Sequence, residues 1–577
     1  IKRHMCGIIG TIGQKIDKKI IENACDKLSS RGPDDAGLFY NDNDNVALGH
    51  RRLSIIDLSE AGHQPMESQD GRYVISFNGE IYNYLELKEM LSSKYQFKTK
   101  TDTEVLLAAY QLEGEKCLAK LNGMFAFAIW DKKEKKLFCA RDRVGIKPFF
   151  YHISDKGFSF ASEIKALLAL GIKARANEKI IFDYLYHGLY DHTDETFFNG
   201  INSLPPGHYL IWQDSHVAIT KYWDVAGVSL NKNLDEQEAR DEFVNLLEDS
   251  ISLRFRSDVP VGVNLSSGVD SNSIYHYGLK VTQEKLHTFS KCMISPEYNE
   301  CEVLEDVLSS EQKKYWHRST ITAQEAFSRI PQINKSQDQP FGGALTIGYD
   351  KMISLAKDAG ITVLLEGQGG DELLAGYECY KDSDSPEMTS QGTIKVLHQD
   401  VLNSDFVKRH TYRTISFPKP FGSKLANAQY RDFRYTKLPR VLRFNDHATM
   451  SYSRELRLPF LDHRIVEFCF SLPDEYKIRD QRQKVLLRDA MKNVVPNKIH
   501  KARKKDSGAI QVEWFRDYYK ESVYELLDSE SFKTRPFWDH KKLRKRVDAF
   551  YSGELDNSFF IWQCLNLELW FREYIDS

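Results

Sequence analysis

Long apolar segments and a surplus of charge are both missing from this chain of 577 residues. The longest apolar run, GMFAFAIW at 123–130, is far shorter than the ~18–20 residues that cross a bilayer, and it predicts a buried strand. The formal net charge of -3 leaves no basic footprint for nucleic acid. We therefore expect neither a membrane nor a nucleic acid among the partners.

Cysteine is also scarce, and its spacing follows no pattern. The nine cysteines form no CxxC pair and no regular framework, which predicts reduced thiols and no zinc site. From Met5 onward no basic leader precedes an apolar stretch, so we predict no secretory signal and expect a cytoplasmic protein. Internal repeats are absent, and the polar segment DSDSPEMTSQG at 382–392 predicts a mobile surface loop.

The chain is too long for one hydrophobic core, and its first part reads as a β-rich domain. Residues 6–225 alternate short β-like runs with turns, and helical stretches interrupt them at 18–28 and 103–112. After residue 231 the spacing of apolar residues changes to that of amphipathic helices, as in LDEQEARDEFVNLLEDSISLRF. Residues 226–234 are therefore the predicted linker.

Residues 235–577 are predicted to be mostly helical, with short buried strands between the helices. Two apolar strands, at 259–265 and 361–367, each run into a polar, glycine-bearing loop and then a helix. This order is typical of a doubly wound parallel sheet.

The first residues suggest a processed terminus. An initiator methionine normally stands first, so Ile1 to His4 are interpreted as remnants of a tag or linker, and residues 1–5 are set aside. Removal of Met5 would give Cys6 a free α-amino group, and a thiol beside an amine is a nucleophile with its own base. The alternative is an ordinary cysteine near a disordered end.

Further residues could complete a site for an amino-acid amide. Asn78 and Gly79 in FNGEIYN offer a side-chain amide and a backbone N–H for an oxyanion. Arg52 could bind a carboxylate, and Glu80 and Asp102 could bind an ammonium group. A hairpin turn at residues 78–80 and an ordinary ion pair are the alternatives.

Taken together, these stretches resemble the class II glutamine amidotransferases. The motifs MCGIIG, RGPDDAG, GHRRLSIID, FNGEIYN, TDTEV, GMFAFAIWD and ARDRVGIKPFFY occur in the order found in that family. The resemblance implies a four-layer αββα fold in which Cys6 attacks the γ-amide of glutamine, with Asn78 and Gly79 as the oxyanion hole. It implies a glutamine pocket made of Arg52, Leu53, Ser54, Ile55, Ile56, Asn78, Gly79, Glu80 and Asp102.

Two loops in the second half could bind phosphate. In LSSGVDSNS (265–273) small residues let backbone N–H groups converge on an anion at a helix N-terminus, although the loop is not a Walker motif. LEGQGGDELLAGY (365–377) places Asp371 and Glu372 at the start of a helix. A plain turn in the first loop and helix capping in the second are the alternatives.

With SRELRLPFLDH (453–463) and QKVLLR (483–488), this half is similar to the asparagine synthetase family. The resemblance implies a domain that adenylates a carboxylate with ATP, with Mg²⁺ held by Asp270 and Asp371 and with Lys484 stabilising the charge on the phosphorus. It implies an ATP site made of Leu265, Ser266, Ser267, Gly268, Asp270, Ser271, Lys291, Glu366, Gly367 and Gln368.

The chain departs from the family at some of these positions. Ser267 and Asn272 replace the usual Gly and Ser, and Glu366 and Gln368 replace the usual Ser and Glu. KKDSGA at 504–509 differs from the stretch expected near the acceptor. The resemblance implies aspartate as acceptor. One alternative is the same chemistry on another carboxylate, such as a hexuronic acid of surface polysaccharide biosynthesis, and another is a non-catalytic nucleotide-binding regulatory protein. A homodimer is left open.

Overall fold

The computed structural model describes residues 6–32, 34–155, 157–283, 285–295, 299–381, 398–502 and 509–576. Three predictions lie outside the described residues: the processed leader 1–5, the loop 382–392, and all but the last residue of the 504–509 stretch.

The N-terminal half contains two antiparallel six-stranded sheets. The strands of the first sheet, in spatial order, are β10 (Ile201–Ser203), β8 (Phe150–Ser154), β9 (Gly157–Ala161), β1 (Gly7–Ile12), β3 (Val46–Arg52) and β2 (Asp35–Asn41). Those of the second are β12 (His216–Lys221), β11 (His208–Gln213), β7 (Lys136–Arg141), β6 (Gly123–Asp131), β5 (Tyr73–Ile81) and β4 (Met66–Glu67). The strand predicted at 123–130 is confirmed as β6.

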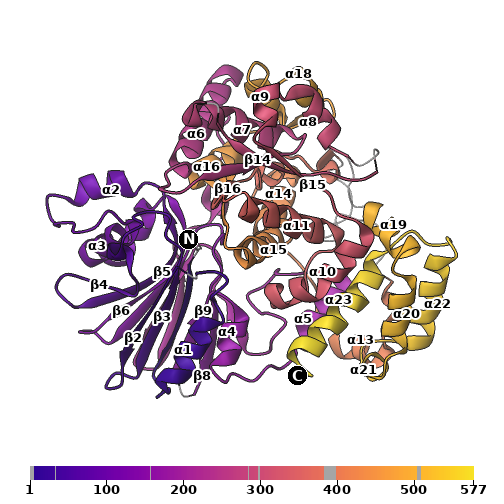
Figure 1. Cartoon of the computed structure of the whole chain (residues 1–577), viewed down its shortest axis with the longest axis horizontal. Helices are drawn as coiled ribbons and strands as arrows, with labels where there is room; N and C mark the ends of the chain where they lie inside the picture. Colours follow the sequence, from indigo (N-terminus) through magenta and orange to yellow (C-terminus); the bar gives the residue numbers. More distant parts are fainter. Residues whose placement is uncertain are drawn as a thin grey trace.

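The two sheets pack face to face because each strand directs alternate side chains to opposite faces: one set enters the core between the sheets, and the other faces the helices outside. On β1, Ile8 points into the core between the sheets while Ile9 points to the outer face. On β5, Val74 and Ile75 divide in the same way. Helices α2 (Tyr84–Leu91) and α3 (Asp102–Glu113) cover one outer face, and α1 (Lys18–Asp26) and α4 (Ile164–Ala169) cover the other (Figure 1). This arrangement confirms the αββα prediction, and α1 and α3 confirm the two predicted helices.

The second half is built on a five-stranded parallel sheet. Its strands, in spatial order, are β15 (Trp316–Ser319), β14 (His287–Lys291), β13 (Val261–Asn264), β16 (Val363–Leu365) and β17 (Glu455–Arg457). Helices α6 (Glu236–Arg254) and α7 (Val269–Thr282) lie on one side of the sheet, and α11 (Ala344–Asp358) and α15 (Lys437–Ser451) lie on the other (Figure 1). The doubly wound sheet is therefore confirmed.

The order of these strands defines the position of a ligand site. The chain leaves β13 towards β14 and β15 on one side, and it later returns to β16 and β17 on the other side. The strand order therefore reverses between β13 and β16, and ligands of such sheets bind beyond the carboxyl ends of the strands at this switch point.

The two halves share buried cores. Leu53 and Tyr82 of the first half belong to the same core as Phe243 and Leu458 of the second. Another core contains residues of α1 and α4 as well as residues of the C-terminal helices. These helices include α19 (Ala509–Asp517), α20 (Lys520–Asp528), α22 (His540–Tyr551) and α23 (Phe559–Tyr574). Between the halves, β12 ends at Lys221 and α6 begins at Glu236, behind a capping box formed by Asp235 and Glu238.

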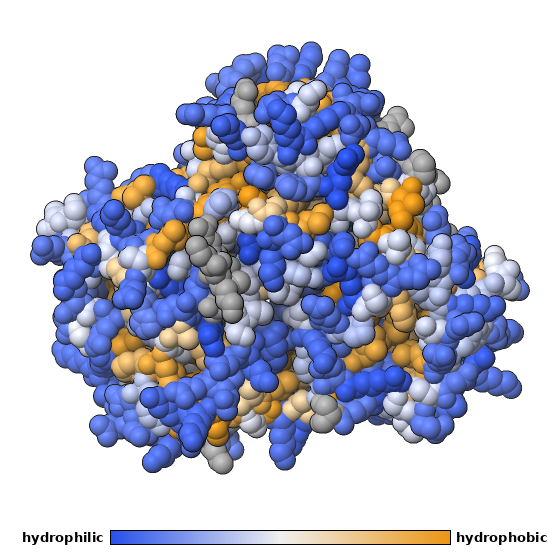
Figure 2. All heavy atoms as spheres, in the orientation of Figure 1, coloured by the Kyte–Doolittle hydropathy of each residue, from blue (hydrophilic) through white to orange (hydrophobic). Residues whose placement is uncertain are grey.

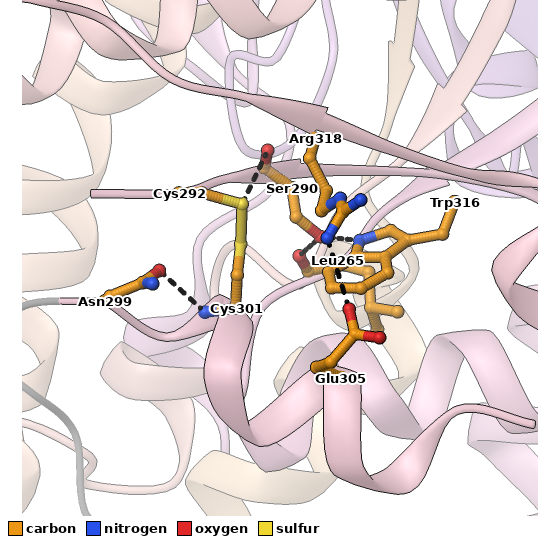
Figure 3. The surroundings of a disulfide bond; sticks show 8 residues. All are labelled: Leu265, Ser290, Cys292, Asn299, Cys301, Glu305, Trp316 and Arg318. Atoms are coloured by element: carbon orange, nitrogen blue, oxygen red, sulfur yellow. Dashed lines mark hydrogen bonds and ion pairs between the residues drawn. A yellow bond between two sulfur atoms is a disulfide. The ribbon is translucent and has the colours of Figure 1, made fainter. Parts of the chain in front are cut away.

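The expectation that all the cysteines are reduced is wrong for one pair. Cys292 and Cys301 form a disulfide with a Cα–Cα distance of 5.4 Å (Figure 3). Cys292 directly follows β14, and Cys301 begins α8 (Cys301–Val307), so the connection between strand and helix brings the two sulfurs together. Sequence spacing could not reveal this pair, because its nine-residue separation matches no common motif.

The face of the molecule in Figure 2 is mostly hydrophilic, with apolar residues in small groups. Among the described residues, no helix has both the length and the apolar character needed to span a membrane.

Candidate active sites

The first site is organised around Cys6, which directly precedes β1. Because β1 pairs with β3, Cys6 lies beside Leu53, whose N–H and carbonyl oxygen are 3.5 and 3.7 Å from the Cys6 Sγ. Arg31 donates a hydrogen bond from Nε to the Cys6 carbonyl oxygen at 3.2 Å. Burial raises the pKa of the Cys6 thiol to about 12, so the thiol needs a base close by before it can act as a nucleophile.

Almost all the residues predicted to bind glutamine line one cavity next to Cys6. Those lining it are Cys6, Arg52, Leu53, Ile55, Ile56, Asn78, Gly79, Glu80 and Asp102. Ser54 does not line it, and its backbone N–H instead donates to Asp34 at 3.1 Å. Sequence reasoning missed the remaining lining residues, which are Gly62, Gln64, Phe77, Thr101, Thr103 and Glu455.

Asn78 and Gly79 lie at the carboxyl end of β5, where the predicted oxyanion donors were expected. Asn78 is completely buried, and its amide nitrogen is 3.5 Å from the Ser162 hydroxyl. Gly79 has φ +156°, and a Cβ atom there would lie 2.1 Å from the carbonyl oxygen of Met124 on β6. Only glycine fits this close approach of β5 to β6.

Two buried acids occupy another wall of the cavity. Asp102 accepts a hydrogen bond from the Ile81 N–H at 3.0 Å, and Glu80 accepts one from Arg457 at 3.1 Å. Burial raises the pKa of Asp102 to about 6 and also raises the pKa of Glu80, to which the charge of Asp102 contributes. The other Glu80 oxygen, Oε1, is buried without a hydrogen-bond partner among the described residues.

Arg52 is held by the loop that follows β3. Its guanidinium donates to the carbonyl oxygens of Ser59 at 2.8 Å and Asp57 at 2.5 Å. These bonds fix the guanidinium at the wall of the cavity, where its positive charge also faces Cys6 and favours the thiolate.

The second site lies at the switch point of the parallel sheet. The loop after β13 folds on itself: the Ser266 N–H donates to the Ser271 hydroxyl at 3.0 Å, and the Gly268 N–H donates to the Ser266 hydroxyl at 3.1 Å. Asn272, which departs from the family pattern, donates to the carbonyl oxygens of Ser266 and Gly268, both at 2.8 Å. The amide therefore braces the same loop that the predicted phosphate site requires.

Asp270, Asp371 and Lys484 meet at this point, although the chain separates them widely. Asp270 is in the first turn of α7, and Asp371 is in α12 (Gly370–Leu373), which follows the loop after β16. Lys484 directly precedes α17 (Val485–Ala490) and has left-handed backbone with φ 55°. Its Nζ pairs with Asp270 and lies 2.6 Å from Asp371. A buried lysine in this sparsely populated conformation is held there by the surrounding structure.

The residues at this site fit a magnesium ion bound together with phosphate. Two carboxylates from the starts of α7 and α12 point to one place, and Asp270 Oδ1 has no hydrogen-bond partner among the described residues. No group of three or more His, Cys, Asp or Glu side chains suited to a metal occurs in the described part of the chain. Mg²⁺ commonly takes one or two protein carboxylates and completes its shell with phosphate oxygens and water, which agrees with such a pair.

Both carboxylate oxygens of Glu366 accept hydrogen bonds from neutral donors. Its Oε2 accepts from Asn264 and Tyr349, both at 2.7 Å, and its Oε1 accepts from Gln368 and Asn445, both at 3.1 Å. A carboxylate has about four lone-pair sites, so these bonds occupy them all. Sequence reasoning could not foresee this arrangement, because the donors come from β13, α11, the loop after β16 and α15.

Lys291 is at the carboxyl end of β14, next to the disulfide. Burial lowers the pKa of its ammonium group, while the charges of Glu300 and Glu366 act in the opposite direction. The carboxyl end of β14 lies at the same edge of the sheet as the loop after β13, which is consistent with the predicted place of Lys291 near the nucleotide.

Several residues that connect the two sites received no role from the sequence. Arg31 is fully buried and pairs with Asp446 on α15 at 2.8 Å, and the neighbouring Asn445 donates to Glu366. Arg457 on β17 donates to Glu80, and its carbonyl oxygen accepts from the Glu366 N–H at 3.0 Å. Both arginines lie in recognised motifs, RGPDDAG and SRELRLPFLDH, but only their partners show what they contact.

Known proteins match both halves. Residues 5–223 match the glutamine amidotransferase domain family, and residues 242–572 match the asparagine synthase family. The chain is 32% identical over 537 residues to glutamine-hydrolyzing asparagine synthetase 3 of Bacillus subtilis, covering 86% of this chain and 85% of that protein. It is 29% identical over 623 residues to asparagine synthetase 1 of the same organism, covering 98% and 96%.

A relative with a different name is of comparable similarity. Amidase chry2 of Gibberella zeae is 27% identical over 617 residues, covering 92% of this chain and 91% of that protein. The order of the two matched domains and the similarity along nearly the whole chain lead to one conclusion: this protein belongs to the asparagine synthetase family of glutamine-hydrolysing carbon–nitrogen ligases.

Proposed function

We propose that this protein transfers the amide nitrogen of glutamine to a carboxylate that it first adenylates with ATP. The observation that supports this most strongly is the presence of two sites of different chemistry in one chain. A cavity beside Cys6, lined by Asn78 and Gly79, lies in the first half, and Asp270, Asp371 and Lys484 converge at the switch point of the second.

In the first reaction, the Cys6 sulfur attacks the γ-carbonyl carbon of glutamine. In the processed protein the α-amine of Cys6 takes the thiol proton and passes it to the leaving nitrogen, which departs as ammonia. Asn78 and the N–H of Gly79 donate to the oxyanion, while Glu80 and Asp102 bind the α-ammonium of the substrate. Water then hydrolyses the thioester to glutamate.

In the second reaction, an oxygen of the acceptor carboxylate attacks the α-phosphorus of ATP, and pyrophosphate leaves. The loop at 265–268 and the N-terminus of α7 bind the phosphates, and Lys484 stabilises the charge that develops at phosphorus. Asp270 and Asp371 would hold Mg²⁺, which supplies neutralisation of phosphate charge when bound. Ammonia then attacks the carbonyl carbon of the acyl-adenylate, and AMP leaves.

Aspartate is the default acceptor, since it is the acceptor that the family resemblance implies. A hexuronic acid is a second candidate because of the surroundings of Glu366. Its four neutral donors leave that carboxylate no free lone pair for the ammonium of aspartate. Gln368 keeps a carbonyl oxygen and a second N–H for partners, and such neutral groups suit the hydroxyls of a sugar acid.

An acceptor comparison tests this proposal. The protein is supplied with ATP, Mg²⁺ and ammonium together with either aspartate or a nucleotide-linked hexuronate, and AMP and pyrophosphate are measured. We expect one of the two acceptors to give AMP and pyrophosphate together with the corresponding amide. Turnover with the hexuronate alone would reassign the acceptor, whereas no AMP with any carboxylate would favour a non-catalytic nucleotide-binding protein.

A further inference from the structure

One wall of the glutamine pocket comes from the synthetase half. Glu455 begins β17 in the parallel sheet, yet it lines the same cavity as Cys6, Asn78 and Asp102. Glu455 is almost completely buried, at 1% relative exposure, so its carboxylate is shielded from bulk water.

Arg457 holds this carboxylate and that of Glu80 side by side. Its Nε donates to Glu455 Oε1 at 2.6 Å, and its Nη2 donates to Glu80 Oε2 at 3.1 Å. The remaining hydrogen-bonding side of the guanidinium donates to the carbonyl oxygens of Arg254 and Arg256 at 2.9 and 2.7 Å. Each acid therefore keeps one oxygen that the arginine does not use.

The charges lining the cavity are out of balance. Glu80, Asp102 and Glu455 are acidic, and Arg52 is the one basic residue among the lining residues. Glu455 acts directly on its neighbours, because its charge contributes to the raised pKa values of Asp102 and Glu80. Arg457 offsets part of this negative charge from behind the cavity, and the α-ammonium group of glutamine brings a further cation into it.

We propose that Glu455 is a glutamine-binding residue, which together with Glu80 and Asp102 holds the α-ammonium of the substrate. The glutamine site is then shared between the two domains. This assignment rests on the proposed glutaminase function. It also gives the pocket a direct connection to the second site, since the next but one residue on β17, Arg457, bonds through its backbone to Glu366.

The test compares two substrates in protein shown by mass to begin at Cys6. Glutamine is compared with glutaramate, which keeps the amide and the carboxylate but lacks the α-amino group. In Glu455→Gln, we expect kcat/KM for glutamine to fall about 10- to 100-fold, mainly through KM, because the acceptor of the ammonium group loses its negative charge. The value for glutaramate should stay unchanged, so the preference for glutamine collapses.

Glu467→Gln is the matched control. Glu467 belongs to the same half and accepts a hydrogen bond from Trp223 Nε1 at 2.7 Å across the domain boundary, but it does not line the cavity. This variant should keep the preference of the unmodified protein. AMP release driven by ammonium should be the same in both variants.

A parallel loss with both substrates in Glu455→Gln would give this residue a structural role and overturn the proposal. Unchanged glutamine kinetics would overturn it as well. Failure of the proposed function looks different, because the unmodified processed protein would then hydrolyse neither substrate.

Discussion

At the scale of single residues, Cys6 lies in surroundings that disfavour its reactive form. Burial and the nearby acids Glu455 and Asp102 raise the thiol pKa, while the Leu53 backbone and Arg52 lower it by less. The net pKa of about 12 means that a thiolate is rare near neutral pH. A base attached to the same residue removes this difficulty.

Protein that retains Ile1–Met5 should therefore hydrolyse no glutamine, because the nitrogen of Cys6 is then a peptide amide and cannot accept a proton. AMP formation from ammonium should persist, since that reaction uses the other site. Glutamate release and the intact mass of the same sample are measured together. Rapid hydrolysis by protein of unprocessed mass would contradict the role of the free amine.

Glutamine binding should weaken in acid. Burial raises the pKa of Asp102 to about 6 in the free pocket, so below that pH the carboxyl group is protonated and loses its attraction for the ammonium group. Titration of Cys6→Ala with glutamine should give a Kd that is constant above about pH 7 and rises about tenfold per pH unit below about pH 6. Asp102→Asn should bind weakly with a flatter profile. Equal Kd values at both ends of this range would show that the acid does not bind the ammonium.

Asp270→Asn and Asp371→Asn should each reduce ammonium-dependent pyrophosphate release by roughly a hundredfold or more, because metal assistance at phosphate is worth several kcal/mol. Glutaminase activity of the processed variants serves as the control for folding and should remain. Full pyrophosphate release by either variant would move the metal site elsewhere.

At the scale of elements, much of the fold follows from patterns visible in the sequence. The alternation in YVISFNGEI gives β5 its two buried faces, and the apolar stretches before the glycine-bearing loops give β13 and β16. What could not be predicted depends on which elements become neighbours. The donors around Glu366 and the approach of Glu455 to Cys6 arise from strand order, which the local pattern does not contain.

The disulfide between the end of β14 and the start of α8 can be tested by counting free thiols. Thiol counting in denaturant without reductant should find seven reactive cysteines, and nine after reduction, because Cys292 and Cys301 are bonded. The double variant Cys292→Ser with Cys301→Ser should give seven under both conditions. Nine thiols in the unreduced protein would restore the expectation drawn from composition.

At the scale of the whole molecule, the halves are joined by shared cores and by buried ion pairs. Arg31 bonds to the Cys6 carbonyl and to Asp446, and Arg457 bonds to Glu80 and, through its backbone, to Glu366. Removing one member of such a pair leaves a buried charge uncompensated, which typically costs about 3–5 kcal/mol. The Cys6 site is thus built partly on contacts with the second half.

Nitrogen from glutamine should enter the product while ATP is cleaved to AMP and pyrophosphate. In the most direct measurement, processed protein receives ATP, Mg²⁺, the acceptor identified in the acceptor comparison, and glutamine whose amide carries a heavy nitrogen isotope. We expect the isotope to appear in the amide of the product, with one AMP released for each amide formed. Formation of ADP and phosphate, or product without the isotope, would contradict it.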